Sequence, residues 1–200
     1  MKLQYKKASQ LTVLLLVLGF LINFSLKPYI NLSTNVSPLT NLSLANSLPN
    51  ISLPNLAGET KSLSDWNGNN IILNFWATWC APCLREIPML NQLQESKADS
   101  LQVIGIAVDR EEPVQKFSSE FEINYPILIG QIQAMEAAQA FGVNVFALPF
   151  TVFILASNET LGVYTGELHQ EQIDNALSIM ETVNSGTKTL DEGRILFLEI

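Results

Sequence analysis

The chain has few of the residues that bind metals, since its 200 residues include two cysteines and a single histidine, His169. A structural zinc site normally takes four cysteine or histidine ligands. The sequence therefore argues against a zinc site, and we expect no bound cofactor. We expect His169 to lie on the surface near the start of the last helix.

Positive charge is also scarce, because the chain has 11 basic against 19 acidic residues and a formal charge of -8. Four of the basic residues lie within the first 27 positions, so the remainder carries 7 basic and 19 acidic residues. A surface of that sign repels phosphate backbones, which argues against a nucleic-acid partner. Hydrophobic residues make up 48% of the chain, which is enough for a sizeable core.

Only one long apolar run occurs, Leu11–Ile22, and it follows Lys2, Lys6 and Lys7. Extended to Leu26 it covers about 16 residues, between the core of a signal peptide and a membrane-spanning helix. Both interpretations keep the lysines in the cytoplasm and export the rest of the chain. No small-residue cleavage pattern follows directly, so we favour an uncleaved signal anchor over a cleaved signal peptide or a buried core helix.

The N-terminal segments differ in composition from the rest of the chain. Residues 1–27 form the predicted signal anchor or transmembrane segment. Residues 28–46 are rich in Asn, Ser, Thr and Leu and have no hydrophobic period, so we expect a flexible tether. Residues 47–184 form the predicted domain, and residues 185–200 are a C-terminal tail to which the sequence assigns no element.

Within the predicted domain, strand patterns alternate with helix patterns. A hairpin is predicted from residues 50–54 and 60–63, strands over 71–76, 101–109, 126–129, 149–155 and 161–166, and helices after 83 and over 113–121, 134–141 and 173–183. This order predicts an α/β fold with a central mixed β-sheet, flanking helices and an N-terminal β-hairpin. The connection between the first two sheet strands should be a right-handed crossover.

Both cysteines lie in the sequence Trp79-Cys80-Ala81-Pro82-Cys83, between a predicted strand and a predicted helix. A helix N-terminus and a Cys-x-x-Cys setting can lower a cysteine pKa from ~8.5 to roughly 3.5–7.5. We expect Cys80 to be the more exposed, attacking thiolate and Cys83 the resolving thiol. A purely structural disulfide is less favoured, because so small a loop gives modest stabilisation. Trp79 either shields the sulfurs and docks a partner or packs in the core.

The run Leu73–Cys83, followed by Glu86 and Pro88, resembles the thioredoxin superfamily. More narrowly, it resembles the membrane-anchored TlpA/ResA-like thiol:disulfide oxidoreductases. The resemblance covers about residues 47–184 and implies a thioredoxin-like fold. The predicted anchor and tether agree with the layout of that family.

Three further positions acquire roles from this resemblance. Leu148-Pro149 matches the family's cis-proline site, which faces the dithiol and presents backbone to the bound partner, although an ordinary trans proline would also suit a strand start. Glu86 matches an acidic residue near the active site of ResA-like proteins, where it could pass a proton, and the alternative is a solvated helix glutamate. Asn74 stands where cytosolic thioredoxins have a buried Asp, which strengthens the case for Glu86.

The resemblance implies a membrane-tethered, exported reductase of specific partner disulfides, such as those of apocytochrome c. Such a protein would take electrons from a membrane thiol transporter, and we expect it to be a monomer. One alternative is an oxidase or isomerase of exported proteins, and another is a non-enzymatic tethered binding module with an inert disulfide. A peroxidase is disfavoured, because the paired thiols suit exchange better.

Overall fold

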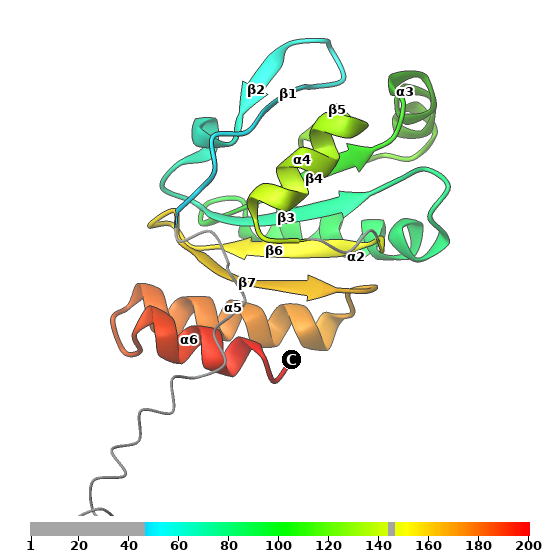
Figure 1. The fold of residues 1–200 in the computed structure, drawn as a ribbon. Coiled ribbons are helices and arrows are strands. Elements are labelled where there is room, and N and C mark those ends of the chain that lie inside the picture. The colour runs from blue at the N-terminus through cyan, green and yellow to red at the C-terminus, as the bar shows by residue number, and fades with distance from the viewer. Residues whose placement is uncertain (1–46, 144–146) are drawn as a thin grey trace, which may run out of the picture. The chain divides into compact units, whose positions relative to one another are not determined.

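The computed structural model describes residues 47–143 and 147–200 (Figure 1). The predicted signal anchor, residues 1–27, and the predicted tether, residues 28–46, lie outside the described residues. Within the two described ranges, none of the helices combines the length and apolar character needed to cross a membrane.

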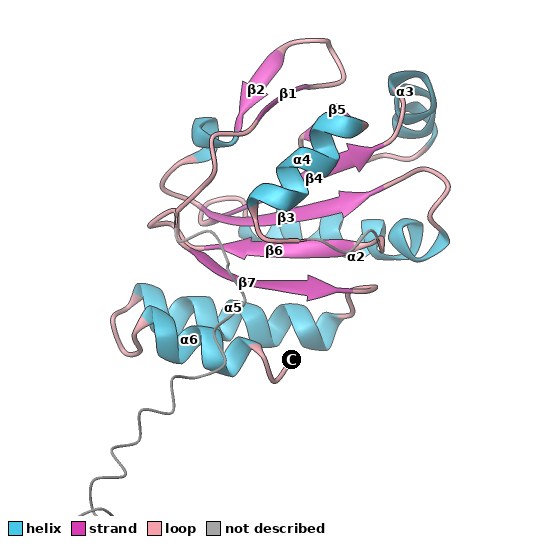
Figure 2. Cartoon of the chain, in the orientation of Figure 1, coloured by secondary structure: helices cyan, strands magenta, loops and turns pink. Residues whose placement is uncertain are grey.

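The described residues form strands and helices close to the predicted ones (Figure 2). The strands are β1 Ser52–Pro54, β2 Thr60–Ser62, β3 Asn70–Trp76, β4 Leu101–Val108, β5 Ile127–Gly130, β6 Phe150–Ile154 and β7 Thr160–Thr165. The helices are the 3-10 helix η1 Leu63–Trp66 and the α-helices α2 Ala81–Lys97, α3 Glu111–Glu120, α4 Ile132–Ala140, α5 Gln170–Asn184 and α6 Leu190–Phe197.

Five of the strands form one mixed sheet in the order β5-β4-β3-β6-β7. Strands β3, β4 and β5 are parallel, whereas β6 and β7 run antiparallel to their neighbours. Strands β1 and β2 form a separate antiparallel hairpin, which touches the edge strand β5 through a bridge between Asn55 and Leu128. The mixed sheet and the hairpin confirm the predicted architecture.

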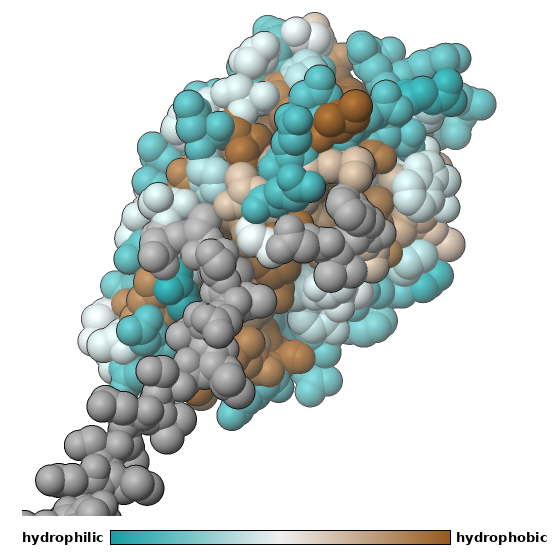
Figure 3. Space-filling view, in the orientation of Figure 1, coloured by the Kyte–Doolittle hydropathy of each residue, from teal (hydrophilic) through white to brown (hydrophobic). Residues whose placement is uncertain are grey.

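The core lies on both faces of the sheet because successive side chains of a strand point to opposite faces. From β3, Ile71, Leu73 and Phe75 pack with α4 and the hairpin. Ile72 and Trp76 pack on the other face, toward α2 and its neighbours. In Figure 1, α4 lies in front of the sheet and α2 behind it. On the visible surface, apolar patches are interrupted by hydrophilic side chains (Figure 3).

The C-terminal residues pack on the sheet, although the sequence predicted no element for residues 185–200. Helix α6 places Phe197 against β7, where a Cβ on Gly162 would lie 2.1 Å from the aromatic ring. The Arg194 guanidinium donates to the carbonyl of Thr160 at 3.0 and 2.8 Å. One compact unit continues to Ile200, so the predicted domain end at residue 184 is corrected.

Candidate active site

The sheet topology gathers the predicted site residues at one edge of the sheet, the edge at which the carboxyl ends of β3 and β4 lie. Strands β3 and β4 are parallel, so the segments that follow them, including Cys80, emerge at the same edge. Strand β6 is antiparallel to β3 and pairs Phe150 with Phe75, which brings the preceding Pro149 to that edge. Strand β7 pairs Thr165 with Phe150, so the turn that follows β7 also begins at that edge.

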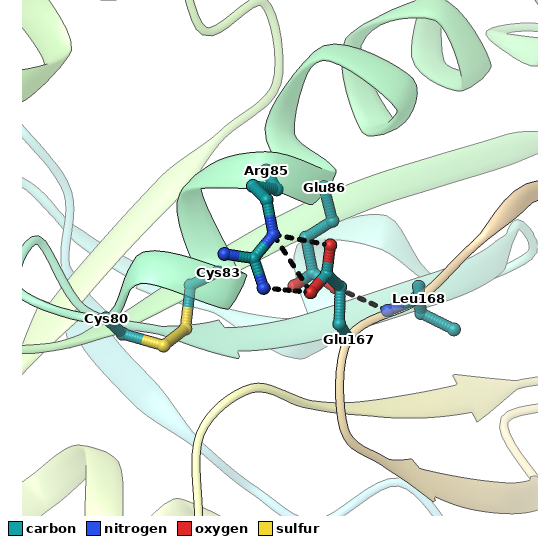
Figure 4. A network of polar contacts seen from close by, with 6 residues as sticks. All are labelled: Cys80, Cys83, Arg85, Glu86, Glu167 and Leu168. Atoms are coloured by element: carbon teal, nitrogen blue, oxygen red, sulfur yellow. Dashed lines mark hydrogen bonds and ion pairs between the residues drawn. A yellow bond between two sulfur atoms is a disulfide. The ribbon is translucent and has the colours of Figure 1, made fainter.

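The two cysteines form a disulfide at the start of α2 (Figure 4). Cys80 is the N-cap residue of α2, and Pro82 lies in the first turn, where its missing N–H costs no helical hydrogen bond. Cys80 is 5% exposed, whereas Cys83 is fully buried on the helix face toward the sheet. Both residues are therefore buried, and Cys80 is the more accessible of the two.

The segment before Cys80 is anchored by a carboxylate that the sequence did not single out. Asp109, directly after β4, is largely buried. Its Oδ2 accepts the Thr78 N–H at 3.1 Å and the Thr78 hydroxyl at 2.5 Å. Asp109 thus ties the end of β4 to the loop that carries Trp79 and Cys80.

Glu86 lies on the buried face of α2, one turn after Cys83, and only 1% of it is exposed. The Asn74 side-chain amide donates to Glu86 Oε1 at 2.6 Å. The Leu168 N–H donates to Oε2 at 2.8 Å (Figure 4). The alternative of a solvated helix glutamate is therefore wrong. The same Asn74 amide donates to the Thr151 hydroxyl at 3.0 Å, which fixes its orientation.

Burial raises the pKa of Glu86 from its ordinary 4.5 to about 7. The hydrogen bonds from Leu168 and Asn74 oppose this rise, and the negative charge of Glu167 adds to it. Near neutral pH the Glu86 carboxyl therefore exists in both protonation states. Such a group can accept and return a proton within one reaction cycle.

An ion pair lies beside this carboxyl (Figure 4). The Arg85 guanidinium binds both oxygens of Glu167, with Nε to Oε1 at 2.9 Å and Nε to Oε2 at 3.1 Å, and its NH2 group also contacts Oε2. The two residues are 82 positions apart. No local pattern in the sequence marks them or Leu168, because their contacts depend on the turn after β7 meeting α2.

Trp79 and the Leu148-Pro149 segment flank the disulfide. Trp79 is 71% exposed, so the alternative that it packs in the core is wrong. The peptide bond between Leu148 and Pro149 is cis, as predicted. Leu148 packs against the apolar cluster that contains both cysteines, and the Pro149 carbonyl accepts the Gly166 N–H at 2.9 Å. His169, as predicted, is exposed and begins α5 as its N-cap residue.

Comparison with known proteins agrees with this geometry. The AhpC/TSA family matches residues 44–161, which is more than half of the chain. A thiol-disulfide oxidoreductase ResA from Geobacillus kaustophilus is 33% identical over 169 residues, covering 83% of this chain and 91% of the relative. A thioredoxin-like protein YneN from Bacillus subtilis is 32% identical over 135 residues, covering 66% of this chain and 76% of the relative.

Solved structures give the same result for the fold. A thiol:disulfide interchange protein of the thioredoxin family from Chlorobium tepidum superposes with a TM-score of 0.59 at 27% identity. The match covers 65% of this chain and 92% of that chain. The fold is therefore thioredoxin-like, as predicted.

Proposed function

This chain belongs to the AhpC/TSA family and, within the thioredoxin superfamily, to the ResA-like thiol-disulfide oxidoreductases, and we propose that it reduces disulfides of specific exported partner proteins. The observation that carries the proposal is the Cys80–Cys83 pair at the start of α2 with the buried Glu86 carboxyl one turn behind it. The electrons reside in the dithiol itself, so the proposal needs no bound cofactor.

The first step is attack by the Cys80 thiolate on a sulfur of the partner disulfide. A bond forms between Cys80 and that sulfur, the partner's own disulfide breaks, and its second sulfur leaves as a thiolate that takes a proton from water. The start of α2 stabilises the Cys80 thiolate through the helix dipole. Trp79 and the backbone at Leu148-Pro149 would hold the partner chain beside Cys80.

The second step releases the reduced partner. The Cys83 thiol transfers its proton to the Glu86 carboxylate, and the resulting thiolate attacks Cys80. The Cys80–Cys83 disulfide forms, the bond to the partner breaks, and the departing thiolate takes the proton from Glu86. The partner has then gained two electrons and two protons, and the protein is left with the disulfide present in this structure.

The cellular setting that we propose rests on the N-terminal sequence. Lys2, Lys6 and Lys7 before Leu11–Ile22 favour a membrane-tethered protein whose domain lies on the exported side. We propose apocytochrome c as a substrate of this kind, a membrane thiol-electron transporter as the reductant, and a monomeric protein. The alternative of an oxidase or isomerase would differ in potential: about -270 mV, as in thioredoxin, favours a reductase, and about -120 mV, as in DsbA, an oxidase.

Trapping with Cys83→Ser tests the exchange itself. This variant keeps the attacking Cys80 but cannot resolve the mixed disulfide, so specific partners should accumulate as covalent adducts that a thiol reductant releases. The variant Cys80→Ser serves as the matched control and should accumulate far fewer adducts. No Cys83→Ser adduct in the native exported compartment would favour the alternative of a binding module with an inert disulfide.

Trp79→Ala is expected to weaken partner binding without destabilising the domain. An exposed tryptophan beside the reactive sulfur is a typical binding hot spot, so KM for a protein disulfide should rise about tenfold. The free energy of unfolding should change by less than about 0.5 kcal/mol, because the side chain is exposed. Steady-state kinetics checks this, with Ile132→Ala, an exposed apolar residue on α4, as control. Equal KM values for both variants would remove Trp79 from the binding surface.

A further inference from the structure

Two neighbouring residues of α2 pair with two neighbouring residues of the turn after β7. On the outside, Arg85 binds the Glu167 carboxylate with two donors. On the inside, the Glu86 carboxyl accepts the Leu168 N–H at 2.8 Å. Figure 4 shows the ion pair beside the buried carboxyl, with the disulfide one turn away along α2.

We propose that Arg85 and Glu167 are positioning residues. Their ion pair, here called the latch, holds the turn at residues 166–168 against α2. The turn in that position excludes water from the Glu86 carboxyl and keeps the carboxyl hydrogen-bonded to Leu168. This inference deepens the proposed function, because it rests on Glu86 as the proton acceptor of the second step. In this proposal the exposed pair acts on the chemistry only through Glu86.

The exposure of the pair favours a positioning role over a stabilising one. The side chain of Arg85 is 60% exposed and that of Glu167 is 20% exposed. Ion pairs so accessible to water contribute only about 0–1 kcal/mol to stability. Their two-donor geometry, however, fixes direction as well as distance. The pair also connects α2, which carries the acceptor Glu86, to the turn after β7, which carries the donating Leu168 N–H.

Several charged or titratable groups surround Glu86. Arg85 and Cys83 lie on the same helix, α2. Glu167, in the turn after β7, adds negative charge beside Glu86. The hydrogen bond from Arg85 and the charge of His169 lower the pKa of Glu167 itself. Burial and the negative charge of Glu86 raise the pKa of Tyr125, which lies just before β5. From β3 the uncharged Asn74 contacts Glu86, and the uncharged Thr151 of β6 contacts Asn74.

Opening the latch would admit water to the carboxyl, and loss of Glu167 would remove a repelling charge, and both effects lower the pKa of Glu86. Loss of the Leu168 hydrogen bond would act the other way, but burial is the largest cause of the raised pKa, so we expect a net fall.

The test uses Glu167→Ala and the charge-swapped double variant Arg85→Glu/Glu167→Arg in the oxidised protein, where the thiols do not titrate. Carbon NMR of the Glu86 carboxyl should show its pKa falling by about one pH unit in Glu167→Ala. Amide exchange at Leu168 should become about tenfold faster. The charge-swapped variant should restore the slow Leu168 exchange, because the ion pair re-forms, whereas the Glu86 pKa should stay below the wild-type value, because a positive charge at position 167 favours the carboxylate. Glu59→Ala, which breaks the exposed pair with Lys61 on the hairpin, is the matched control and should change neither.

A structural role alone would alter unfolding without altering these two readouts. An unchanged Glu86 titration and unchanged Leu168 exchange in Glu167→Ala would overturn the latch, and so would a charge-swapped variant whose Leu168 amide exchanges as fast as in Glu167→Ala. Neither measurement depends on turnover. A wild-type protein that fails to reduce any disulfide would therefore overturn the proposed function while leaving the latch separately testable.

Discussion

Cys80→Ser is expected to reduce the rate of disulfide reduction by more than about a thousandfold, because a serine hydroxyl is not ionised at neutral pH and cannot form a disulfide. Cys83→Ser should retain the first attack and lose only the resolving step. Both rates can be followed as thiol release from 5,5′-dithiobis(2-nitrobenzoate) by the reduced proteins. Cys83→Ser should release about one equivalent rapidly and keep the other as a mixed disulfide.

The fold is expected to survive both substitutions. The disulfide closes a loop with a sequence separation of 3, for which loop-closure entropy gives roughly 2 kcal/mol of stability. Each serine variant should therefore unfold cooperatively in urea, at a lower midpoint than the oxidised wild type and close to the reduced wild type. A Cys80→Ser variant that reacts as fast as wild type, beside an inert Cys83→Ser, would reverse the assigned roles of the two sulfurs.

The elements around the cysteines were predictable because their signals are local. The continuous apolar run of β3 is the pattern of a strand buried on both faces, and a short loop connects it to the helix whose first turn contains Pro82. The burial of Glu86 also had a signal, because it lies three residues after Cys83 and four before Leu90, on the apolar face of α2. That spacing favours burial over the solvated alternative.

Other contacts have no local signal, because they join distant segments. The Leu168 N–H meets Glu86 only once β7 has paired with β6 and turned toward α2. Helix α6 is an intermediate case. Its Thr189 and Glu192 form a capping box, a recognisable start signal. Gly193 lowers its intrinsic helix propensity, and the packing of Phe197 on Gly162 compensates in the folded protein.

Glu86→Gln is expected to slow disulfide reduction about a hundredfold, because the variant cannot take the proton from the Cys83 thiol. The loss should fall on the resolving step, so mixed disulfides through Cys80 should persist longer while their rate of formation stays near that of wild type. Rapid-mixing kinetics separates the two steps. Glu95→Gln, a change on an exposed part of α2, is the control. An unchanged resolving rate in Glu86→Gln would exclude Glu86 as the proton acceptor.

The same substitution is expected to remove a pH dependence of stability in the oxidised protein. The pKa of Glu86 rises from 4.5 in the unfolded chain to about 7 in the folded protein. Between these values the folded protein holds a proton that the unfolded chain has released, so the stability from Glu86 is fully present below about pH 4.5 and is lost as the pH rises to about 7. The difference between these two pKa values corresponds to roughly 3 kcal/mol of unfolding free energy. In urea unfolding, the free energy of unfolding of wild type should therefore fall by about 3 kcal/mol relative to that of Glu86→Gln between pH 4 and pH 8. Parallel curves for the two proteins would mean that Glu86 titrates at its ordinary pKa and is solvated, contrary to its buried contacts with Asn74 and Leu168.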